Sequence, residues 1–187
     1  MSKKKIILGT ALRLFVDYGF HGTATAKIAQ EANVATGTLF NYFRTKDELI
    51  VALYDSILKG MDDFVIGSMD YHSISKESVR SFFVATLSWS LENPIHYRYL
   101  QQFIHSPYFN LVAKDTALQE EHPLFVLIKN GIDLVIIKQL PIPFIQSLFT
   151  AQINGLFNYV LSNDLDKAEQ YEFTEEAFEM FWKMIED

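Results

Sequence analysis

Proline is absent from the first 93 residues of this 187-residue chain, and the five prolines lie at positions 94, 107, 123, 141 and 143. Proline disrupts a helix interior because its ring removes a backbone donor and clashes with the preceding turn. Glycine is also sparse, and no segment shows the sustained alternation of apolar and polar residues that marks a half-buried strand. The sequence therefore predicts an all-α fold.

Apolar residues recur at helical spacing along most of the chain. We expect helices over about residues 4–18, 25–32, 36–42, 46–64, 75–92, 94–105, 118–138, 143–162 and 174–185. Gly19 ends the first helix, and Thr23 or Thr25 caps the second. Thr45 and Glu48 have the spacing of a capping box at the start of the fourth helix. Asn93-Pro94 is typical of a helix start.

The net charge of −7 hides an uneven distribution along the chain. Residues 1–46 carry seven Lys/Arg against two Asp/Glu, whereas the remainder carries 9 against 21. A basic head on an acidic body suits contact with a polyanion by the head alone, although chance segregation is an alternative. We therefore predict two domains, a head over 1–46 that contacts a polyanion and a second helical domain over 47–187.

Several classes of protein are disfavoured by the sequence. The chain has no cysteine, so disulfides and thiolate metal sites are excluded. Lys3 to Lys5 before Ile6 could open a secretory signal, but Arg13 and Asp17 interrupt the apolar run. No uncharged stretch reaches the roughly 18 apolar residues of a membrane span. We expect a cytoplasmic protein without a membrane partner.

An enzyme or a metal site is also disfavoured. The adjacent side chains of Glu120, Glu121 and His122 would rarely converge on one point, and no partner motif accompanies them. His96 and His105 are nine residues apart and would not share a helix face. We expect neither a catalytic activity nor a cofactor.

Residues 23–43, TATAKIAQEANVATGTLFNYF, form two short helical segments around Asn33, a residue that tolerates positive φ. Apolar residues of the two segments can pack together: Ile28, Ala29 and Ala32 against Val34, Leu39 and Phe43. This pattern is typical of a helix–turn–helix. A purely structural hairpin would have the same apolar pattern, but would not explain the small and hydroxyl residues left on the outer face.

The run from Phe15 through Leu49 resembles the signature of the TetR/AcrR family of transcriptional regulators. The matching elements are Phe-x-x-x-Gly-Phe at residues 15–20, Ile-Ala before the turn, Gly-Thr-Leu-Phe-x-Tyr-Phe at residues 37–43, and Lys-Asp-Glu-Leu at residues 46–49. The resemblance implies an N-terminal three-helix bundle with a helix–turn–helix, followed by a C-terminal helical domain for ligand binding and dimerisation. Asn33, Ala35, Ala26 and Phe40 depart from the glycine, the Ser/Thr cap, the arginine and the tyrosine common at these positions.

The resemblance and the exposed face together give the candidate DNA-binding residues: Thr25, Lys27, Thr36, Gly37, Thr38, Asn41, Tyr42 and Lys46. Hydroxyl groups suit phosphates, and Asn and Thr methyl groups suit base edges. Tyr42 packed in the core is an alternative, and Lys3 to Lys5 are either a solvated tail or further phosphate contacts.

Residues 47–187 contain 12 Phe, seven Tyr and two Trp, interspersed with polar groups. An aromatic cavity with a few polar anchors is the usual form of a small-molecule site. The candidate ligand-binding residues are Ser88, Trp89, Phe103, His105, Phe125, Phe149 and Gln152. Ordinary core or surface is the alternative for each of them.

The helices expected over 143–162 and 174–185 are apolar on more than one side, which favours pairing with a second copy of the chain. The candidate dimer residues are Phe144, Leu148, Gly155, Tyr159, Phe178 and Trp182. A dimer also suits DNA geometry, because two recognition helices must lie about 34 Å apart along the duplex. A helix buried within one monomer is the alternative.

These features predict a ligand-responsive regulator, a repressor that binds a palindromic double-stranded DNA operator as a homodimer and is released by a small-molecule effector. A ligand-independent helical DNA-binding or adaptor protein is the alternative.

Overall fold

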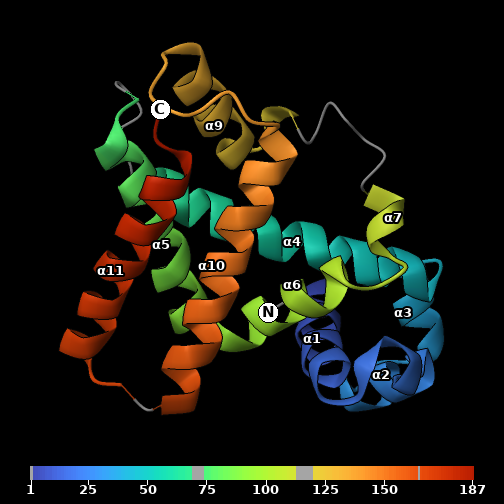
Figure 1. The fold of residues 1–187 in the computed structure, drawn as a ribbon. Helices are drawn as coiled ribbons and strands as arrows, with labels where there is room; N and C mark the ends of the chain where they lie inside the picture. The colour runs from blue at the N-terminus through green and yellow to red at the C-terminus, as the bar shows by residue number, and fades with distance from the viewer. Residues whose placement is uncertain (1, 69–73, 113–119, 164) are drawn as a thin grey trace. The chain divides into compact units, whose positions relative to one another are not determined.

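The computed structural model describes residues 2–68, 74–112, 120–163 and 165–187. Their helices are α1 (Lys3–Gly22), α2 (Thr25–Glu31), α3 (Thr36–Tyr42), α4 (Lys46–Gly67), α5 (Lys76–Glu92), α6 (Pro94–Ile104), α7 (Phe109–Val112), α9 (Pro123–Asp133), α10 (Ile142–Asn163) and α11 (Lys167–Ile185) (Figure 1). The only extended pairing in these ranges is an isolated bridge between Ile137 and Glu186. The predicted all-α fold is confirmed.

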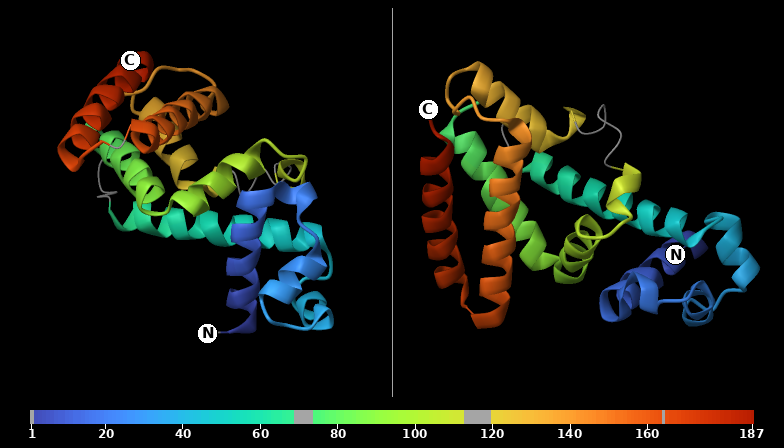
Figure 2. Two further views of the ribbon diagram at one scale, coloured as in Figure 1. Left: turned by 90° about the horizontal axis from the view of Figure 1, so that it is seen from below. Right: turned by 45° about the vertical axis from the view of Figure 1, so that its right-hand side comes forward.

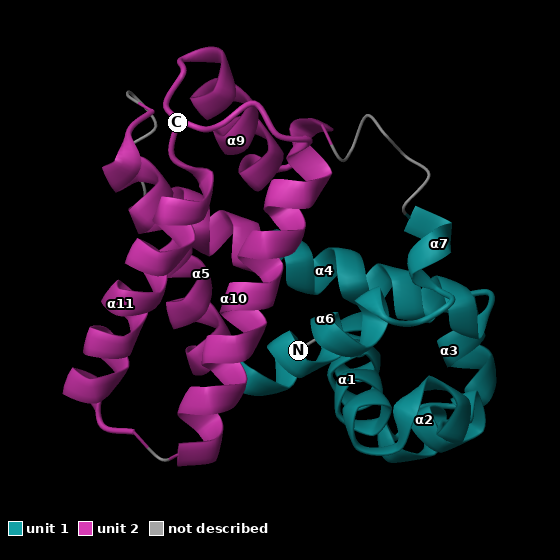
Figure 3. Cartoon of the chain, in the orientation of Figure 1, with its two compact units in different colours: residues 1–60, 93–114 teal, residues 61–92, 115–187 magenta. Residues whose placement is uncertain are grey.

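The chain forms two compact units, shown in different colours in Figure 3. Unit 1 comprises residues 1–60 and 93–114, and unit 2 comprises residues 61–92 and 115–187. Packing thus adds α6, α7 and the first part of α4 to the segment predicted to bind DNA. The domain boundary expected at residue 46, between DNA binding on one side and ligand binding and dimerisation on the other, stays a prediction.

Unit 1 is built around α1, which packs against α2 and α6. Its core includes the fully buried side chains of Phe15, Leu39, Phe43 and Tyr99. The Tyr99 hydroxyl donates a hydrogen bond of 2.8 Å to the carbonyl of Ile50 in α4. Burial raises the pKa of Tyr99, so the phenol stays neutral and keeps this donor.

Backbone breaks in unit 1 lie where the sequence predicts them. Gly19 has φ 73° and ψ 167°, which interrupts α1, and Asn33 has φ 51° in the turn between α2 and α3. Glu48 N–H donates to the Thr45 hydroxyl at 3.0 Å, as expected of a cap. The Glu48 carboxylate accepts the Arg44 N–H at 2.8 Å, one residue before the cap. The helix start is therefore confirmed, although the reciprocal bond of the capping box comes from the Arg44 N–H and not from the N–H of the cap residue Thr45.

Unit 2 has an aromatic core between α5, α10 and α11. Phe83 lies at its centre, with ring centroids 5.7 Å from Phe149, 5.7 Å from Phe178 and 5.8 Å from Phe181. Helices α10 and α11 form an antiparallel hairpin, seen side by side in the views of Figure 2. Arg80 of α5 forms an ion pair with Glu175 of α11, and both side chains are about three-quarters buried. This hairpin is thus fixed on α5 by apolar and charged contacts.

Several helix bounds differ from the sequence prediction, most of all those of α9 and α11. α9 begins at Pro123 and ends at Asp133, because the next residues turn back through Val135, at φ 57°. Residues 118 and 119 of the expected helix lie outside the described ranges. α11 begins at Lys167, where Asp166 and Glu169 form a capping box that the apolar pattern did not indicate. The short helix α7 was not predicted.

The expected threonine cap of α2 was wrong. The N-cap of α2 is Ala24, which makes no side-chain capping bond. Thr23 is buried and donates instead to the carbonyls of Leu14, at 3.0 Å, and Gly19, at 2.9 Å. Its hydroxyl therefore serves the end of α1.

Candidate nucleic-acid interface

The turn between α2 and α3 has the geometry of a helix–turn–helix. Asn33 takes the positive φ, and the Val34 N–H donates to the Ala29 carbonyl at 3.0 Å across the turn. Ile28 of α2 and Leu39 of α3 are both fully buried. The two short helices are thus held together by their apolar faces, and their other faces remain available.

The outer face of α3 carries small, polar and aromatic side chains. Thr36, Gly37 and Asn41 are exposed, and Tyr42 is 43% exposed. Thr38 is half-buried. The N-cap residue Ala35 makes no side-chain capping bond, in keeping with the missing Ser/Thr cap noted in the sequence. This face can reach into a groove without a bulky residue at its start.

Two lysines of the candidate set have partners within unit 1. The Lys27 ammonium lies 3.6 Å from the centre of the Tyr18 ring, a cation–π contact. The Lys46 ammonium donates to the carbonyl of Phe20 at the end of α1. Thr25, the remaining candidate in α2, is half-buried. The structure therefore brings the α3 residues together on one face, while these two lysines face α1.

Two residues beside this face were not among the candidates. Phe40 is 40% exposed on α3, and Arg44 is exposed directly after the helix ends. Lys4, in the first turn of α1, lies 5.8 Å from the ring centre of Phe43. The lysines at residues 3–5 thus belong to the first turn of α1 and are exposed, so both alternatives, solvation alone and phosphate contact, stay open. The positive charge of Arg44 next to α3 was the signal in the sequence that could have found it.

The candidate ligand residues fall in both units. Phe103 and His105 belong to unit 1, where Phe103 is buried with its ring 4.0 Å from that of Tyr54 and His105 is exposed. Ser88, Trp89, Phe125, Phe149 and Gln152 belong to unit 2. Trp89 and Phe149 are buried in its interior, and the other three are half-buried. The ligand site stays a prediction.

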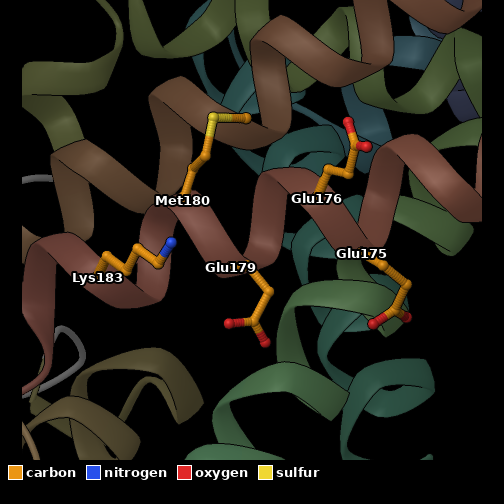
Figure 4. Close-up of a pocket in the computed structure, with 5 residues that line it drawn as sticks. All are labelled: Glu175, Glu176, Glu179, Met180 and Lys183. Atoms are coloured by element: carbon orange, nitrogen blue, oxygen red, sulfur yellow. The ribbon is translucent and has the colours of Figure 1, made fainter.

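A hollow on the outside of α11 is lined by Glu175, Glu176, Glu179, Met180 and Lys183 (Figure 4). All five residues come from one helix, and none is a candidate ligand residue. Glu175 is paired with Arg80, and Glu179 lies 2.7 Å from the Lys76 ammonium. This hollow is a feature of the charged surface of α11.

The candidate dimer residues divide between surface and core. Phe144 and Tyr159 of α10 are 50% and 44% exposed, Gly155 is exposed and Leu148 is half-buried. Phe178 and Trp182 of α11 are buried within the protomer, so they are not available to a second chain. The exposed apolar residues of α11 are Tyr171, Phe173, Met180 and Met184.

The acidic and histidine residues weighed as a chemical site do not cluster. In the parts of the chain that the structure describes, no three His, Asp or Glu side chains are placed to hold a metal ion. His122 instead caps α9, with its Nδ1 accepting the Leu124 N–H at 3.2 Å, and burial lowers its pKa. Within the same described ranges, every helix falls short of the length and apolar character that spanning a bilayer requires.

Comparison with known proteins gives a consistent result. Residues 7–53 match the family model described as bacterial regulatory proteins, tetR family. The chain is 32% identical over 76 residues to the uncharacterized HTH-type transcriptional regulator YhgD of Bacillus subtilis, a match that spans 38% of the chain and 40% of that protein's length. The chain thus spans less than half of that curated relative.

Solved structures extend the likeness over the whole chain. A putative tetR family transcription regulator from Shewanella sp. PV-4 is 31% identical, with a TM-score of 0.89 over 100% of both chains. FadR from Bacillus subtilis, solved in complex with stearoyl-CoA, shares the fold with a TM-score of 0.74 at 18% identity, over 95% of this chain and 96% of that one.

Proposed function

Because the chain belongs to the TetR family of bacterial regulatory proteins, we propose that it is a DNA-binding transcriptional regulator that acts as a homodimer. The observation that carries this proposal is the outer face of α3, which presents Thr36, Gly37, Asn41 and Tyr42 from a helix–turn–helix. We infer a cytoplasmic location from this function, because the protein would act where its DNA operator lies.

The contact set that we propose follows from exposure and chemistry. Asn41 and the methyl groups of Thr36 and Thr38 suit base edges, whereas hydroxyl groups, including that of Tyr42, suit phosphates. Gly37 permits close approach of the backbone. Thr25 and Lys27 contribute from α2, Lys27 after leaving the Tyr18 ring. We leave Lys46 out of the proposed set, because its ammonium already has a partner in α1.

Dimerisation through the α10–α11 hairpin is supported by its exposed apolar surface. Phe144 and Tyr159 of α10 lie four turns apart, and the ring of Tyr159 lies 5.3 Å from that of Phe173 in α11. Gly155 and the half-buried Leu148 lie between the two aromatic residues of α10. This surface suits a second copy of the chain, because each half of a two-fold interface presents the same patch to the other.

A small-molecule effector acting on residues 47–187 completes the proposal. FadR, which shares the fold, was solved with stearoyl-CoA. The aromatic content of residues 47–187 suits an apolar ligand. An effector that prefers a dimer with misplaced recognition helices lowers DNA affinity by its preference for that state, and about 1–3 kcal/mol of coupling suffices. The protein is then a repressor released by its ligand.

Selection from a random duplex library tests DNA binding without knowledge of the operator. We expect enrichment of a palindrome, bound at nanomolar concentration and more weakly as salt rises from 50 to 200 mM. Tyr42→Ala should weaken binding to the selected duplex at least tenfold, because the loss occurs in both half-sites. The control truncation, Leu134→Ala, removes an exposed apolar side chain at the end of α9, outside the α10–α11 hairpin, and should leave the affinity unchanged.

Failure to enrich any sequence, with a folded protein, would contradict DNA recognition and favour the adaptor function. Equal losses for Tyr42→Ala and Leu134→Ala would contradict the role of the α3 face.

A further inference from the structure

The end of α1 is interrupted at Gly19, where φ is 73° and ψ is 167°. A helical hydrogen bond that spans a residue requires helical torsions at that residue, so the carbonyl groups just before the break lose donors from the next turn. Buried carbonyl groups need donors from elsewhere. In this chain, side chains from outside α1 donate to carbonyl groups on both sides of the break.

Two of these donors come from the DNA-binding elements. Thr23, which precedes α2, donates to the carbonyls of Leu14 and Gly19 at 3.0 and 2.9 Å. Lys46, at the start of α4, donates to the carbonyl of Phe20. The broken end of α1 therefore ties the entry to α2 and the start of α4 to one point.

The third donor comes from α6, far along the chain. The Gln102 side-chain amide donates through Nε2 to the carbonyl of Val16 at 3.2 Å. Tyr99, one turn earlier on α6, packs its ring 6.3 Å from Phe15 and 5.6 Å from Phe20. We call the group formed by Thr23, Lys46, Gln102 and the α1 carbonyls the α1 joint.

The oxygen of the Gln102 amide destabilises the fold. Its Oε1 is buried and has no hydrogen-bond partner among the described residues. A buried acceptor without a partner is destabilising by an amount similar to what the bond to Val16 contributes. An apolar residue of similar shape would therefore give about the same stability. What the amide adds is a directional contact between α6 and α1.

We propose that Gln102 is a positioning residue that fixes α6 in register on α1, so that a shift of α6 displaces the elements held at the α1 joint. α6 follows α5 directly through Asn93, so the chain itself connects α6 to unit 2. The aromatic contacts of Tyr99 hold α6 against α1, and its hydroxyl bond to Ile50 joins α6 to α4, whereas the Gln102 amide joins α6 to the backbone of α1 by a hydrogen bond. This inference rests on the proposed regulatory function and names the residue through which α6 acts on the DNA-binding helices.

Hydrogen exchange measured by mass spectrometry tests the joint without DNA. The variant is Gln102→Met, which keeps the length of the side chain and removes both polar atoms, and the matched control is Gln101→Met on the same helix. We expect exchange in residues 14–24 to become about tenfold faster in Gln102→Met alone, with exchange in α10 and α11 unchanged. The melting temperature should stay within about 3 °C of the original, because the lost bond and the removed orphan oxygen offset each other.

DNA affinity supplies the functional readout. We expect Gln102→Met to weaken binding to the selected duplex by about fivefold or more, and Gln101→Met to leave it unchanged. If Gln102→Met does not fold, Gln102→Leu replaces it, because its smaller apolar side chain also lacks a donor and an acceptor. The same readouts and the same expectations apply.

Equal exchange in residues 14–24 for the two methionine variants would overturn the inference. So would a large loss of melting temperature with faster exchange throughout unit 1, since that pattern marks a merely structural residue. If the unmodified protein binds no DNA, the proposed function fails, while the exchange comparison still decides whether Gln102 holds the α1 joint.

Discussion

Replacing Lys46 by methionine separates two roles for a lysine at the start of α4. The structure gives its ammonium a partner, the carbonyl of Phe20, and so assigns it to the α1 joint. A lysine in the same place that bound a phosphate would leave the carbonyl without this donor. Lys46→Met keeps the apolar stem and removes only the charged group.

The expected loss of stability follows from the bond that is broken. A hydrogen bond from a charged group contributes about 1.5–3 kcal/mol when well buried, and Lys46 is only half-buried, so we take about 1 kcal/mol. For a chain of this size that lowers the melting temperature by about 3 °C. Scanning calorimetry measures this shift directly.

The salt dependence of DNA binding distinguishes the two roles. Each phosphate contact adds about 0.9 to the slope of log affinity against log salt, so a dimer that loses two lysine contacts loses about 2 from that slope. We predict an unchanged slope between 50 and 200 mM salt together with the loss of stability. Lys59→Met, an exposed lysine on the same helix, controls for the change in net charge. A slope lower by about 2 with an unchanged melting temperature would refute the reasoning.

Three further predictions concern unit 2. Gly131→Ala should lower the free energy of unfolding by about 1–2 kcal/mol, since the added Cβ would lie 2.5 Å from Ile137 Cδ1. Gly9→Ala is the control and should cause no such loss, because an added Cβ there meets nothing within 4 Å. Equal melting temperatures for the two variants would contradict this prediction. Tyr159→Glu should convert the dimer to monomers in light scattering, because a charge would be buried at the interface, and an unchanged mass would exclude this surface. Burial lowers the pKa of His122 below its usual 6.5, so the unfolded chain binds the proton first and the free energy of unfolding should fall as the pH drops through about 6.5. His122→Asn keeps a capping side chain at the start of α9 and should reduce this fall. Identical pH profiles for the two proteins would contradict the prediction.

Local backbone features were predictable because they depend on neighbouring residues. Gly19 and Asn33 take positive φ where the sequence places a helix end and a turn. The Thr45 cap and the apolar pairing of Ile28 with Leu39 follow from spacing alone. The helix–turn–helix could therefore be recognised before its structure was known.

Contacts between distant segments were not predictable from the same patterns. The partners of Lys27 and Lys46 lie in α1, and a lysine near a recognition helix has the same sequence context whether it faces DNA or a carbonyl. α6 packs with unit 1 although it follows α5 of unit 2. Only the tertiary fold brings Gln102 to Val16.

The surface of α11 shows a similar limit. Its apolar residues occur on more than one side, and periodicity does not say which side meets the core of its own protomer. The structure buries Phe178 beside Phe83, with Trp182 buried beside Phe178, and leaves Phe173 and Met180 outside. The exposed side of α11, which suits a second chain, is thus less aromatic than its buried side. The larger aromatic residues of the core were therefore mistaken for interface residues in the sequence.

The central claim is that two copies of the α3 face read one duplex together. The most direct test is a fluorescence anisotropy titration of the selected palindrome against the same duplex with five base pairs inserted between its half-sites. Five base pairs rotate one half-site by about half a helical turn, so a dimer can no longer reach both from one side of the DNA. The account predicts at least tenfold weaker binding to the expanded duplex, and equal affinity for the two duplexes would contradict it.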